Sequence, residues 1–385
     1  MFFMVAYVGS QVVGGGTAFS SSLGISTSSG MWLTAAIILL YTMLSGFHAV
    51  SKTDVLQALF MFFSLIILPI VAIIQLGGIG PILDAMHAEG AGFTSIWTFG
   101  FGAIVGLLGI GFGSPGNPHI LVRYMSLKNV KEMRQAAMIG TVWNVIMGWG
   151  AVWVGLAGRA FFSGPEAMPN ENHEAIFLQL GQEVFNPLFM GILMVAVLAA
   201  IMSSADSQLL VGASAIVRDV YDKLFGKGKE ISEEKLVLYS RFAVLFIMTL
   251  SVWLAFSAEE FVFWMILFAF GGLGACFGPA LLLTFYWKRT TGPGVLTGMV
   301  LGLITVILVK QQPEWTYVIT DFKQLSADLL FGITYEAVPG FIVATLATVL
   351  VSLVTKKPAN ADQVVDELKF GYVDPPKQNQ SEKIS

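Results

Sequence analysis

Charged side chains are scarce in this sequence. Asp, Glu, Lys and Arg make up 12 % of its 385 residues, whereas hydrophobic residues make up 55 %. A soluble domain carries about 25 % charged residues, so this chain has too few to cover an ordinary water-facing surface. The composition excludes a soluble enzyme and a disordered protein. A net charge of −4 with no basic stripe argues against nucleic-acid binding.

Cysteines, catalytic histidines and nucleotide-binding motifs are also lacking. Cys276 is the only cysteine, which excludes an intrachain disulfide and a cysteine-based metal cluster. The sequence has no Walker motif and no Rossmann fingerprint, so we expect no ATP binding and no organic cofactor. Its four histidines are scattered, and no Ser-His-Asp pattern stands out. A membrane enzyme is therefore not expected.

Long apolar runs are what the sequence has in place of charge. A membrane-spanning helix needs roughly 17–25 mostly apolar residues. Such runs predict about ten spans, at residues 1–19, 31–50, 55–79, 93–115, 136–156, 187–217, 242–258, 261–287, 292–309 and 337–354. Transmembrane strands would alternate apolar and polar residues, whereas these runs are continuous. The sequence therefore predicts an all-α polytopic membrane protein, with a transmembrane domain at 1–357 and a polar tail at 358–385.

Lys and Arg gather on one side of the predicted membrane. Of the 21 basic residues, 18 fall in alternate loops and in the tail, and only Arg159, Lys310 and Lys323 fall on the other side. Basic loops stay in the cytoplasm. The asymmetry therefore predicts a multi-pass protein of the cell's inner membrane with both ends of this chain in the cytoplasm.

The first span is rich in glycine, with Gly9, Gly14, Gly15 and Gly16. Glycines in membrane helices mark close packing against other helices. We therefore expect this helix inside a bundle rather than facing lipid, and we expect further helices of that bundle to precede Met1. A chain that starts at Met1 is the alternative. No basic segment precedes the apolar run, so we do not expect it to act as a signal peptide.

Residues 109–118 (GIGFGSPGNP) interrupt the fourth span. Proline lacks a backbone donor and disfavours helix at the residue before it, so this segment cannot be a regular helix throughout. Unwound backbone at membrane depth is tolerated only where it is buried in protein or lines a cavity. Secondary transporters bind their substrates at such broken helices. The alternative interpretation is a plain surface loop at 114–118, in which the glycines serve only packing.

A group of small and hydroxyl residues lies in the sixth span. Ala200, Ser203 and Ser204 share one helical face. Two hydroxyls and a carbonyl freed from the helix would offer the hard oxygen ligands that sodium needs. The alternative is that both hydroxyls bond back to carbonyls one turn earlier.

Two carboxylates, Asp54 and Asp206, lie at or near membrane depth. Burying an ionisable residue in a membrane is costly, so such a residue indicates function. Both are candidates for an ion path. The alternatives are that Asp54 caps its helix, with Thr53 nearby, and that Asp206 pairs with a basic residue of the inner loops.

Several stretches resemble motifs of one transporter family. Residues 51–58 (SKTDVLQA) resemble SWTDTVQA, residues 116–125 (GNPHILVRYM) resemble GQPHI-x-x-RFM, and residues 198–204 (LAAIMSS) resemble LAAVMST. Shorter matches at 277–279 and 298–306 extend the similarity to about residues 1–312. The motifs are those of the sodium:solute symporter family, and of its proline-transporting members above all.

The resemblance implies a leucine-transporter-like fold of five-plus-five inverted repeats that lacks its first two core helices. It also implies import of proline or another small organic solute with sodium, by alternating access. Sodium would bind the Ala200 carbonyl and the hydroxyls of Ser203 and Ser204. Tyr7 matches a tyrosine that faces the family's substrate cavity.

For the solute, the resemblance implies a site along the broken helix, at Ile110, Ser114, Asn117 and Pro118. The proline-transporting members have Trp and Tyr where this chain has Ile110 and Ser114, and a serine-like residue where it has Asp206. Two other functions stay open: a solute sensor built on a transporter-like domain, and a non-functional fragment of a symporter.

Overall fold

The computed structural model describes residues 1–44, 47–90, 101–162, 172–225, 232–257, 262–310, 335–359 and 361–362. All regular secondary structure in these ranges is helical, which confirms the predicted class. The chain divides into two compact units, and each is described by itself. Unit 1 comprises Met1–Phe99 and Gln135–Ala269, and unit 2 comprises Gly100–Arg134 and Phe270–Ser385.

Most of the helices belong wholly to one unit. Those of unit 1 are α1 (Phe2–Leu23), α2 (Thr27–Leu44), α3 (Phe47–Gln75), α4 (Gly80–Ala88), the short 3-10 helix η5 (His173–Ala175), α9 (Ile176–Val184), α10 (Pro187–Ser214), the π-helix η6 (Ala215–Phe225) and α11 (Glu233–Ser257). Those of unit 2 are α6 (Phe101–Gly109), the 3-10 helix η2 (Ile110–Gly116), α7 (Pro118–Met125), α13 (Gly292–Lys310) and α16 (Ala337–Val354). Helices α8 (Val130–Phe161) and α12 (Val262–Tyr286) run from one unit into the other.

Nine helices in the described ranges are long and apolar enough to cross a membrane. They correspond to nine of the ten predicted spans. In the fourth span, residues 93–100 lie outside the described part, and the remainder forms α6 followed by η2 rather than one long helix. The glycines and Pro115 account for this interruption. The predicted tail is described only at 358–359 and 361–362.

The predicted boundary between the second and third spans is wrong. Residues 51–54 were expected to form a loop, but α2 ends at Leu44 and α3 begins at Phe47. The hydroxyl of Thr53 donates to the Val50 carbonyl (2.9 Å) and also bonds with the Tyr41 hydroxyl of α2, so the helix accommodates this polar segment. Asp54 therefore lies inside α3, about two turns from its start, and does not cap it.

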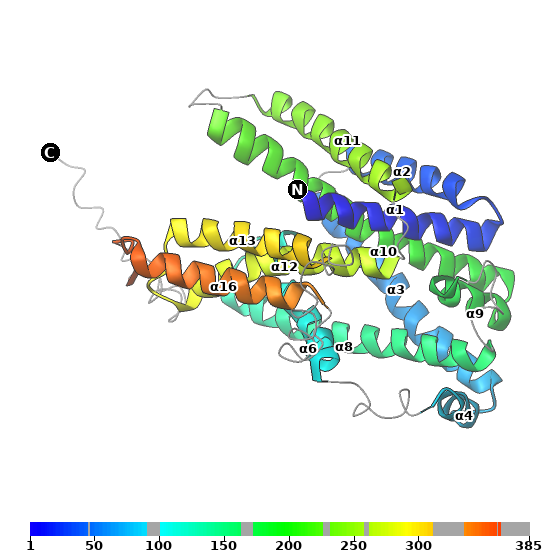
Figure 1. Ribbon diagram of the computed structural model, residues 1–385. Coiled ribbons are helices and arrows are strands. Elements are labelled where there is room, and N and C mark those ends of the chain that lie inside the picture. Colours follow the sequence, from blue (N-terminus) through cyan, green and yellow to red (C-terminus); the bar gives the residue numbers. More distant parts are fainter. Residues whose placement is uncertain are drawn as a thin grey trace. The chain divides into compact units, whose positions relative to one another are not determined.

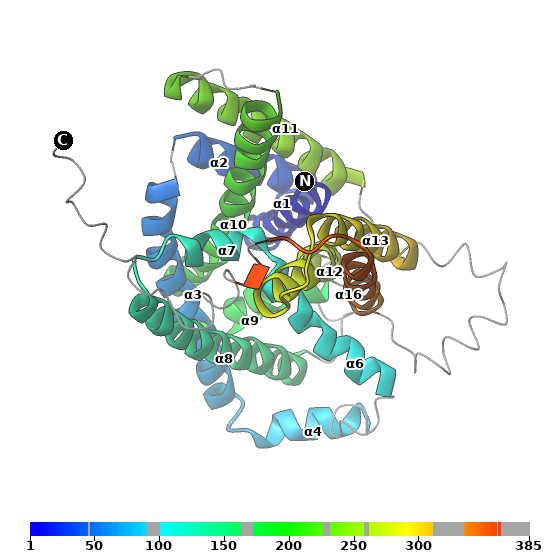
Figure 2. The same cartoon turned by 90° about the vertical axis from the view of Figure 1, so that its left-hand side faces the viewer.

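Helix α1 lies in the interior of unit 1, as its glycines predicted. It packs against α2, α10 and α11 (Figures 1 and 2). Gly16 shows why small residues are needed there. A Cβ atom on Gly16 would lie 3.0 Å from the Thr27 carbonyl oxygen of α2 and would overlap the Met31 side chain. The close approach of the two helices therefore depends on glycine.

In unit 2, α13 and α16 lie side by side (Figure 1). Gly294, Gly298 and Gly302 form a stripe on α13 that faces α16. A Cβ atom on Gly298 would lie 2.7 Å from the carbonyl oxygen of Ala344, and it would also overlap the Thr348 hydroxyl. The stripe lets the two backbones approach closely, as small residues do in membrane helix pairs.

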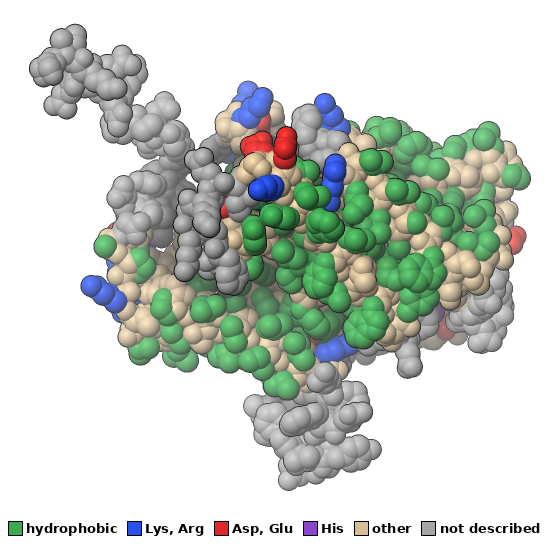
Figure 3. All heavy atoms as spheres, turned by 90° about the horizontal axis from the view of Figure 1, so that it is seen from above, with side chains coloured by type: hydrophobic (Ala, Val, Ile, Leu, Met, Phe, Trp, Pro, Cys, Tyr) green, Lys and Arg blue, Asp and Glu red, His purple; other side chains and the backbone are tan. Residues whose placement is uncertain are grey.

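The described surface is largely apolar. Figure 3 shows hydrophobic side chains over most of the described part of one face, with few charged groups among them. Trp253 of α11, for example, is 68 % exposed. A soluble monomer rarely exposes apolar surface on this scale, whereas lipid-facing helices do.

The first residues of the tail are held to unit 2 by charge. The Asp362 carboxylate accepts a hydrogen bond from the Lys357 ammonium group (2.5 Å) and lies 3.9 Å from that of Lys288, which follows α12. The hydrogen bond from Lys357 lowers the pKa of Asp362 most, and the charges of both lysines lower it further. This ion pair is therefore present at neutral pH and is lost when acid protonates Asp362.

Candidate functional site

The interrupted segment at 109–118 adopts the irregular structure that its composition predicts. Residues Ile110–Gly116 form the 3-10 helix η2, Asn117 is extended with φ −82° and ψ 112°, and α7 starts at Pro118. Proline is favourable at the first position of a helix because its missing N–H would have no partner there. The segment thus separates α6 from α7 at the predicted place.

The glycines of this segment bring it against the middle of α12. A Cβ atom on Gly116 would lie 2.6 Å from the Leu273 carbonyl oxygen and 2.7 Å from the Gly274 Cα atom. Helix α12 is an apolar span of 25 residues, and Leu273 and Gly274 lie near its centre. The buried part of the segment, at Gly113, Gly116 and Asn117, therefore lies level with the middle of a helix that is long and apolar enough to span a membrane. This favours the broken-helix interpretation over the surface loop.

Asn117 is the buried polar side chain of the break, and it is 0 % exposed. Its amide nitrogen donates to the Gly113 carbonyl at 2.7 Å. Its side-chain oxygen Oδ1 has no hydrogen-bond partner among the described residues. By contrast, Ser114 is exposed, and Ile110 and Pro118 are partly buried. The break therefore offers one buried acceptor for a ligand.

In unit 1, Ala200, Ser203 and Ser204 share one face of α10, as predicted. The expected release of the Ala200 carbonyl from the helix is not seen, because α10 is a continuous α-helix from Pro187 to Ser214. The alternative in which both serine hydroxyls bond back one turn is not found: no such bond joins Ser203 to Ala199 or Ser204 to Ala200 in the described residues. Both side chains are partly buried. Their hydroxyl oxygens therefore remain available as ligands.

Tyr7 of α1 reaches this same face. Its hydroxyl forms a side-chain hydrogen bond with Ser204 of α10, and α1 and α10 pack closely along this part of unit 1. The sequence placed Tyr7 in the solute site and Ser204 in the ion site. Their direct contact links the two.

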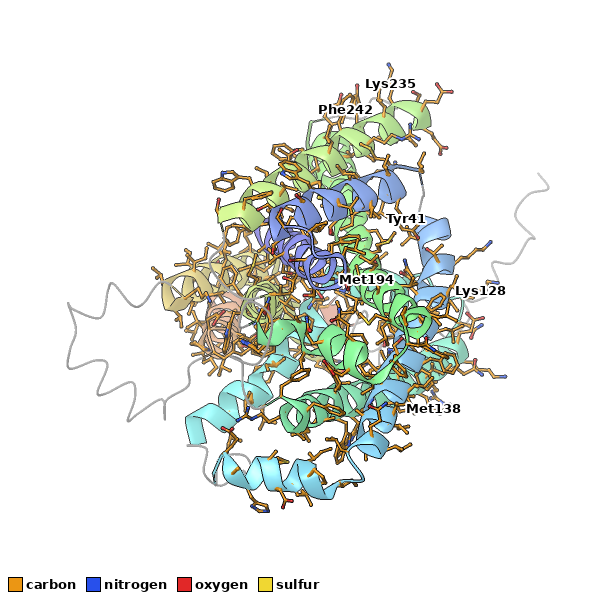
Figure 4. All side chains as sticks on the ribbon, turned by 90° about the vertical axis from the view of Figure 1, so that its right-hand side faces the viewer. Tyr41, Lys128, Met138, Met194, Lys235 and Phe242 are labelled. Carbon is orange, nitrogen blue, oxygen red and sulfur yellow. The ribbon has the colours of Figure 1, made fainter. Side chains whose placement is uncertain are left out.

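The two carboxylates lie at a second polar cluster, where α2, α3 and α10 meet. Asp206 is 0 % exposed and accepts a hydrogen bond from Ser207 at 3.3 Å. Tyr41 of α2 is labelled in Figure 4, and its hydroxyl bonds with Thr53. Asp54 and Asp206 both act electrostatically on Tyr41. Tyr41 was not anticipated, because a single tyrosine in an apolar span gives no local signal. The cluster brings both acidic residues to the same tyrosine.

A cavity of about 470 Å³ lies in unit 1 between α1, α3, α9, α10 and the start of α12. Its lining is mostly apolar and includes Ala200, with Thr17 and Ser64 as polar members. Glu174 of η5 stands at its wall, where its carboxylate accepts hydrogen bonds from the backbone N–H groups of Val262 (3.0 Å) and Phe263 (2.8 Å). Glu174, which the sequence did not single out, therefore caps α12 beside the cavity. The size and lining suit a small organic ligand.

The predicted site residues thus form two sets. Tyr7, Ala200, Ser203, Ser204, Asp54 and Asp206 belong to unit 1. Ile110, Ser114, Asn117 and Pro118 belong to unit 2, where they follow one another along the broken segment.

Long apolar helices, a helix broken at membrane depth and an oxygen-lined helix face are the features of a polytopic secondary transporter. A model of the sodium:solute symporter family matches residues 1–302. The chain belongs to this family. It is a sodium-coupled solute transporter and a multi-pass protein of the inner membrane, not an enzyme, and sodium is its coupling ion.

Two curated relatives show the extent of the similarity. The osmoregulated proline transporter OpuE of Bacillus subtilis is 36 % identical over 365 residues, which cover 94 % of this chain and 70 % of that protein. The sodium/proline symporter of Escherichia coli is 37 % identical over 367 residues, covering 94 % of this chain and 69 % of that protein. The chain thus spans about 70 % of the length of these relatives.

A solved structure has the same fold. It is the substrate-bound, outward-open state of a Na⁺-coupled sialic acid symporter, with a TM-score of 0.71 and 18 % identity. The match covers 92 % of this chain and 73 % of that one. It confirms the predicted leucine-transporter-like fold class.

Proposed function

We propose that this protein imports proline, or a closely related amino acid, together with sodium by alternating access. The observation that carries the proposal is the similarity to proline transporters over almost the whole chain: OpuE and the high-affinity proline transporter PutP of Bacillus subtilis are 36 % and 37 % identical over 94 % and 93 % of it. Proline-transporting members have aromatic side chains where this chain has Ile110 and Ser114. Other residues of this chain would therefore have to supply the contacts that those aromatic side chains make.

The proposed sodium ligands are the Ala200 carbonyl oxygen and the hydroxyl oxygens of Ser203 and Ser204. Their common face on α10 and the absence of back-bonding from either serine, within the described residues, support this assignment. Three oxygen donors suit a hard cation, and further oxygen ligands would complete its coordination. Ser204 also contacts Tyr7, so ion binding on α10 is connected to α1.

As solute-binding residues we propose Tyr7 of unit 1 and, in unit 2, Ile110, Ser114, Asn117 and Pro118 of the broken helix. The Asn117 Oδ1 atom is a buried acceptor that suits the ammonium group of an amino acid. The exposed Ser114 and the partly buried Ile110 would contact the solute only in a state that closes over it.

Asp54 and Asp206 are proposed as members of the ion path. Their shared neighbourhood at Tyr41 supports this role, because two acidic groups near one tyrosine create a negative potential that attracts a cation. Sodium would favour the state of alternating access in which the solute site is complete. It can shift the equilibrium between the two states only by the difference in its affinity for them. The membrane potential adds about 2.3 kcal/mol per charge per 100 mV.

The proposed topology places both ends of this chain in the cytoplasm, with a transmembrane domain at 1–357 and a cytoplasmic tail at 358–385. The distribution of Lys and Arg supports this orientation.

Uptake of labelled proline into proteoliposomes tests the proposal. Accumulation should require an inward sodium gradient, and an equal potassium gradient should not replace it. Ser203→Ala and Ser204→Ala should each raise the sodium concentration for half-maximal uptake. Thr249→Ala is the matched control, because Thr249 is exposed on α11 and bonds back to Leu245. Unchanged sodium dependence in both serine variants would contradict the proposed sodium ligands. Uptake of other solutes but not of proline would contradict proline as the proposed solute.

A further inference from the structure

A second pocket, with several charged residues in its wall, lies in unit 1 apart from the sites described above. Its volume is about 440 Å³, and it lies between the end of α2, the junction of α10 with η6, and the start of α11. The lining residues that matter for a ligand are the charged Arg218, Glu233 and Arg241, the hydroxyl-bearing Thr42 and Ser240, and the apolar Leu44. None of the proposed sodium or solute residues lines this pocket, here named the α2–α11 pocket.

The α2–α11 pocket combines fixed charges of both signs. Arg218 has one weak partner, Asp222, at 3.8 Å on the same helix. The side chains of Arg241 and Glu233 make no ion pair or hydrogen bond in the part of the chain that the structure describes. The pocket therefore presents two guanidinium groups and one carboxylate whose charges are not neutralised by each other. A ligand that suits it carries an anionic and a cationic group together.

Thr42 provides an independent sign of a ligand. It is 3 % exposed, and its Oγ1 atom has no hydrogen-bond partner in the described residues. Threonines in membrane helices usually bond back one turn, as Thr34 of the same helix does with the Gly30 carbonyl (2.8 Å). A buried hydroxyl without a partner costs about 1–3 kcal/mol. A polar ligand that bonds to Thr42 would remove this cost.

Ser240 adds an acceptor on the opposite wall. Its hydroxyl donates to the Leu236 carbonyl at 2.8 Å, so its oxygen lone pairs point away from that bond and can accept from a cationic group.

The position of the pocket identifies the kind of ligand. Its walls come from three membrane-spanning helices, and its charged residues lie toward their ends, where η6 follows α10 and α11 begins. Leu44 and Val237 line it and are nevertheless 85 % and 53 % exposed, so its rim continues into apolar, lipid-facing surface. A ligand that enters there needs a charged head and an apolar body.

We propose that the α2–α11 pocket binds the headgroup of a zwitterionic phospholipid with a primary ammonium group. The phosphate contacts Arg218 and Arg241, and it accepts a hydrogen bond from Thr42. The ammonium group donates to Glu233 and Ser240. The acyl chains lie along the exposed apolar rim at Leu44 and Val237. An anionic lipid without an ammonium group fits less well, because it has no cationic donor for Glu233 and Ser240.

Native mass spectrometry of the purified protein with defined lipids tests this site. Phosphatidylethanolamine is compared with phosphatidylcholine, whose quaternary ammonium cannot donate hydrogen bonds, and with phosphatidylglycerol, which has no ammonium. Wild-type protein should retain phosphatidylethanolamine about tenfold better than either, as expected for charge-assisted hydrogen bonds. Equal retention of all three lipids would overturn the proposal.

Matched variants assign the preference to the pocket. Glu233→Gln should abolish the preference for phosphatidylethanolamine over phosphatidylcholine, and Arg241→Gln should weaken retention of all three lipids. Glu234→Gln and Lys235→Gln make the same charge changes on neighbouring α11 residues that do not line the pocket, and both variants should retain lipid as wild type does. Lys235 is labelled in Figure 4. Equal losses in the controls would overturn the assignment.

Two further measurements complete the test. The first separates an effect on lipid binding from an effect on folding, and the second distinguishes a lipid from a small soluble ligand. Thr42→Val should keep or raise the thermal stability of the delipidated protein while it weakens lipid retention; loss of stability with unchanged retention would overturn the role of Thr42. Phosphoethanolamine, the headgroup without acyl chains, should not compete at millimolar concentration. Effective competition would overturn the lipid assignment in favour of a small soluble zwitterion.

Discussion

The hydrogen bond between Tyr7 and Ser204 joins a proposed solute residue on α1 to a proposed sodium ligand on α10. Tyr7→Phe removes this bond and lets the Ser204 hydroxyl rotate away from the ion. A hydrogen bond contributes about 0.5–1.5 kcal/mol net, which corresponds to a roughly 2- to 12-fold change in an equilibrium constant. We expect Tyr7→Phe to raise the half-saturating sodium concentration by such a factor. Ser204→Ala should raise it further, because it also removes a ligand.

The double variant shows whether the phenol acts through Ser204. If it does, Tyr7→Phe has no further effect in the Ser204→Ala background, and the coupling energy equals the single-variant effect of about 0.5–1.5 kcal/mol. Sodium titration of the thermal unfolding temperature provides the assay, since a bound ion stabilises the folded state by mass action. Thr249→Ala controls for loss of a hydroxyl elsewhere. Additive effects of the two substitutions would refute the reasoning.

Three further substitutions test other parts of the structure. Gly298→Val should destabilise unit 2 by roughly 1–3 kcal/mol through overpacking against Ala344, seen as a lower unfolding temperature; an unchanged temperature would contradict the close contact of α13 and α16. Glu174→Gln should weaken the cap of α12 by about 1 kcal/mol and speed amide exchange at its first residues, and unchanged exchange would show that the amide group caps equally well. Asp54→Asn should reduce sodium-driven accumulation relative to solute exchange, whereas wild-type coupling would leave Asp54 with a structural role.

Hydropathy predicted the spans well because the bilayer requires every crossing segment to satisfy its own backbone. It predicted the ends poorly, because a helix does not stop where its apolar run stops. Helix α11 begins at Glu233, well before the predicted start at 242, and α8 begins at Val130 rather than 136. Charged side chains at those ends extend into water while the backbone stays helical. The same error turned residues 51–54 into a loop.

The local geometry around the proposed site residues was predicted more reliably than the contacts between helices. Spacing along one helix placed Ala200, Ser203 and Ser204 on one face, and the Gly-Pro content of 109–118 predicted the break. The contact of Tyr41 with Thr53 and the cap that Glu174 provides for α12 were not anticipated. Glu174 and Val262 are 88 residues apart. Local spacing carries no information about such contacts, which depend on how separate helices pack.

Asn117 tests whether the broken segment is built for a ligand. Its amide group donates to the Gly113 carbonyl at 2.7 Å, but its buried Oδ1 atom has no partner within the described residues. An unsatisfied buried acceptor costs about 1–3 kcal/mol, whereas the bond to Gly113 contributes about 0.5–1.5 kcal/mol. Asn117→Leu removes both. We therefore expect the solute-free variant to unfold at the same temperature as the parent protein or slightly above it.

If Oδ1 accepts from the solute's ammonium group, the same substitution should weaken solute binding about tenfold, since hydrogen bonds to charged groups contribute about 1.5–3 kcal/mol. Binding is measured by solute titration at saturating sodium, and stability by thermal unfolding without solute. A ligand role requires weaker binding at undiminished stability, because only the bound state uses the Oδ1 atom. A variant that unfolds earlier without solute but binds it as tightly as the parent would instead assign Asn117 to packing, with its hydrogen bond to Gly113 as the dominant contribution.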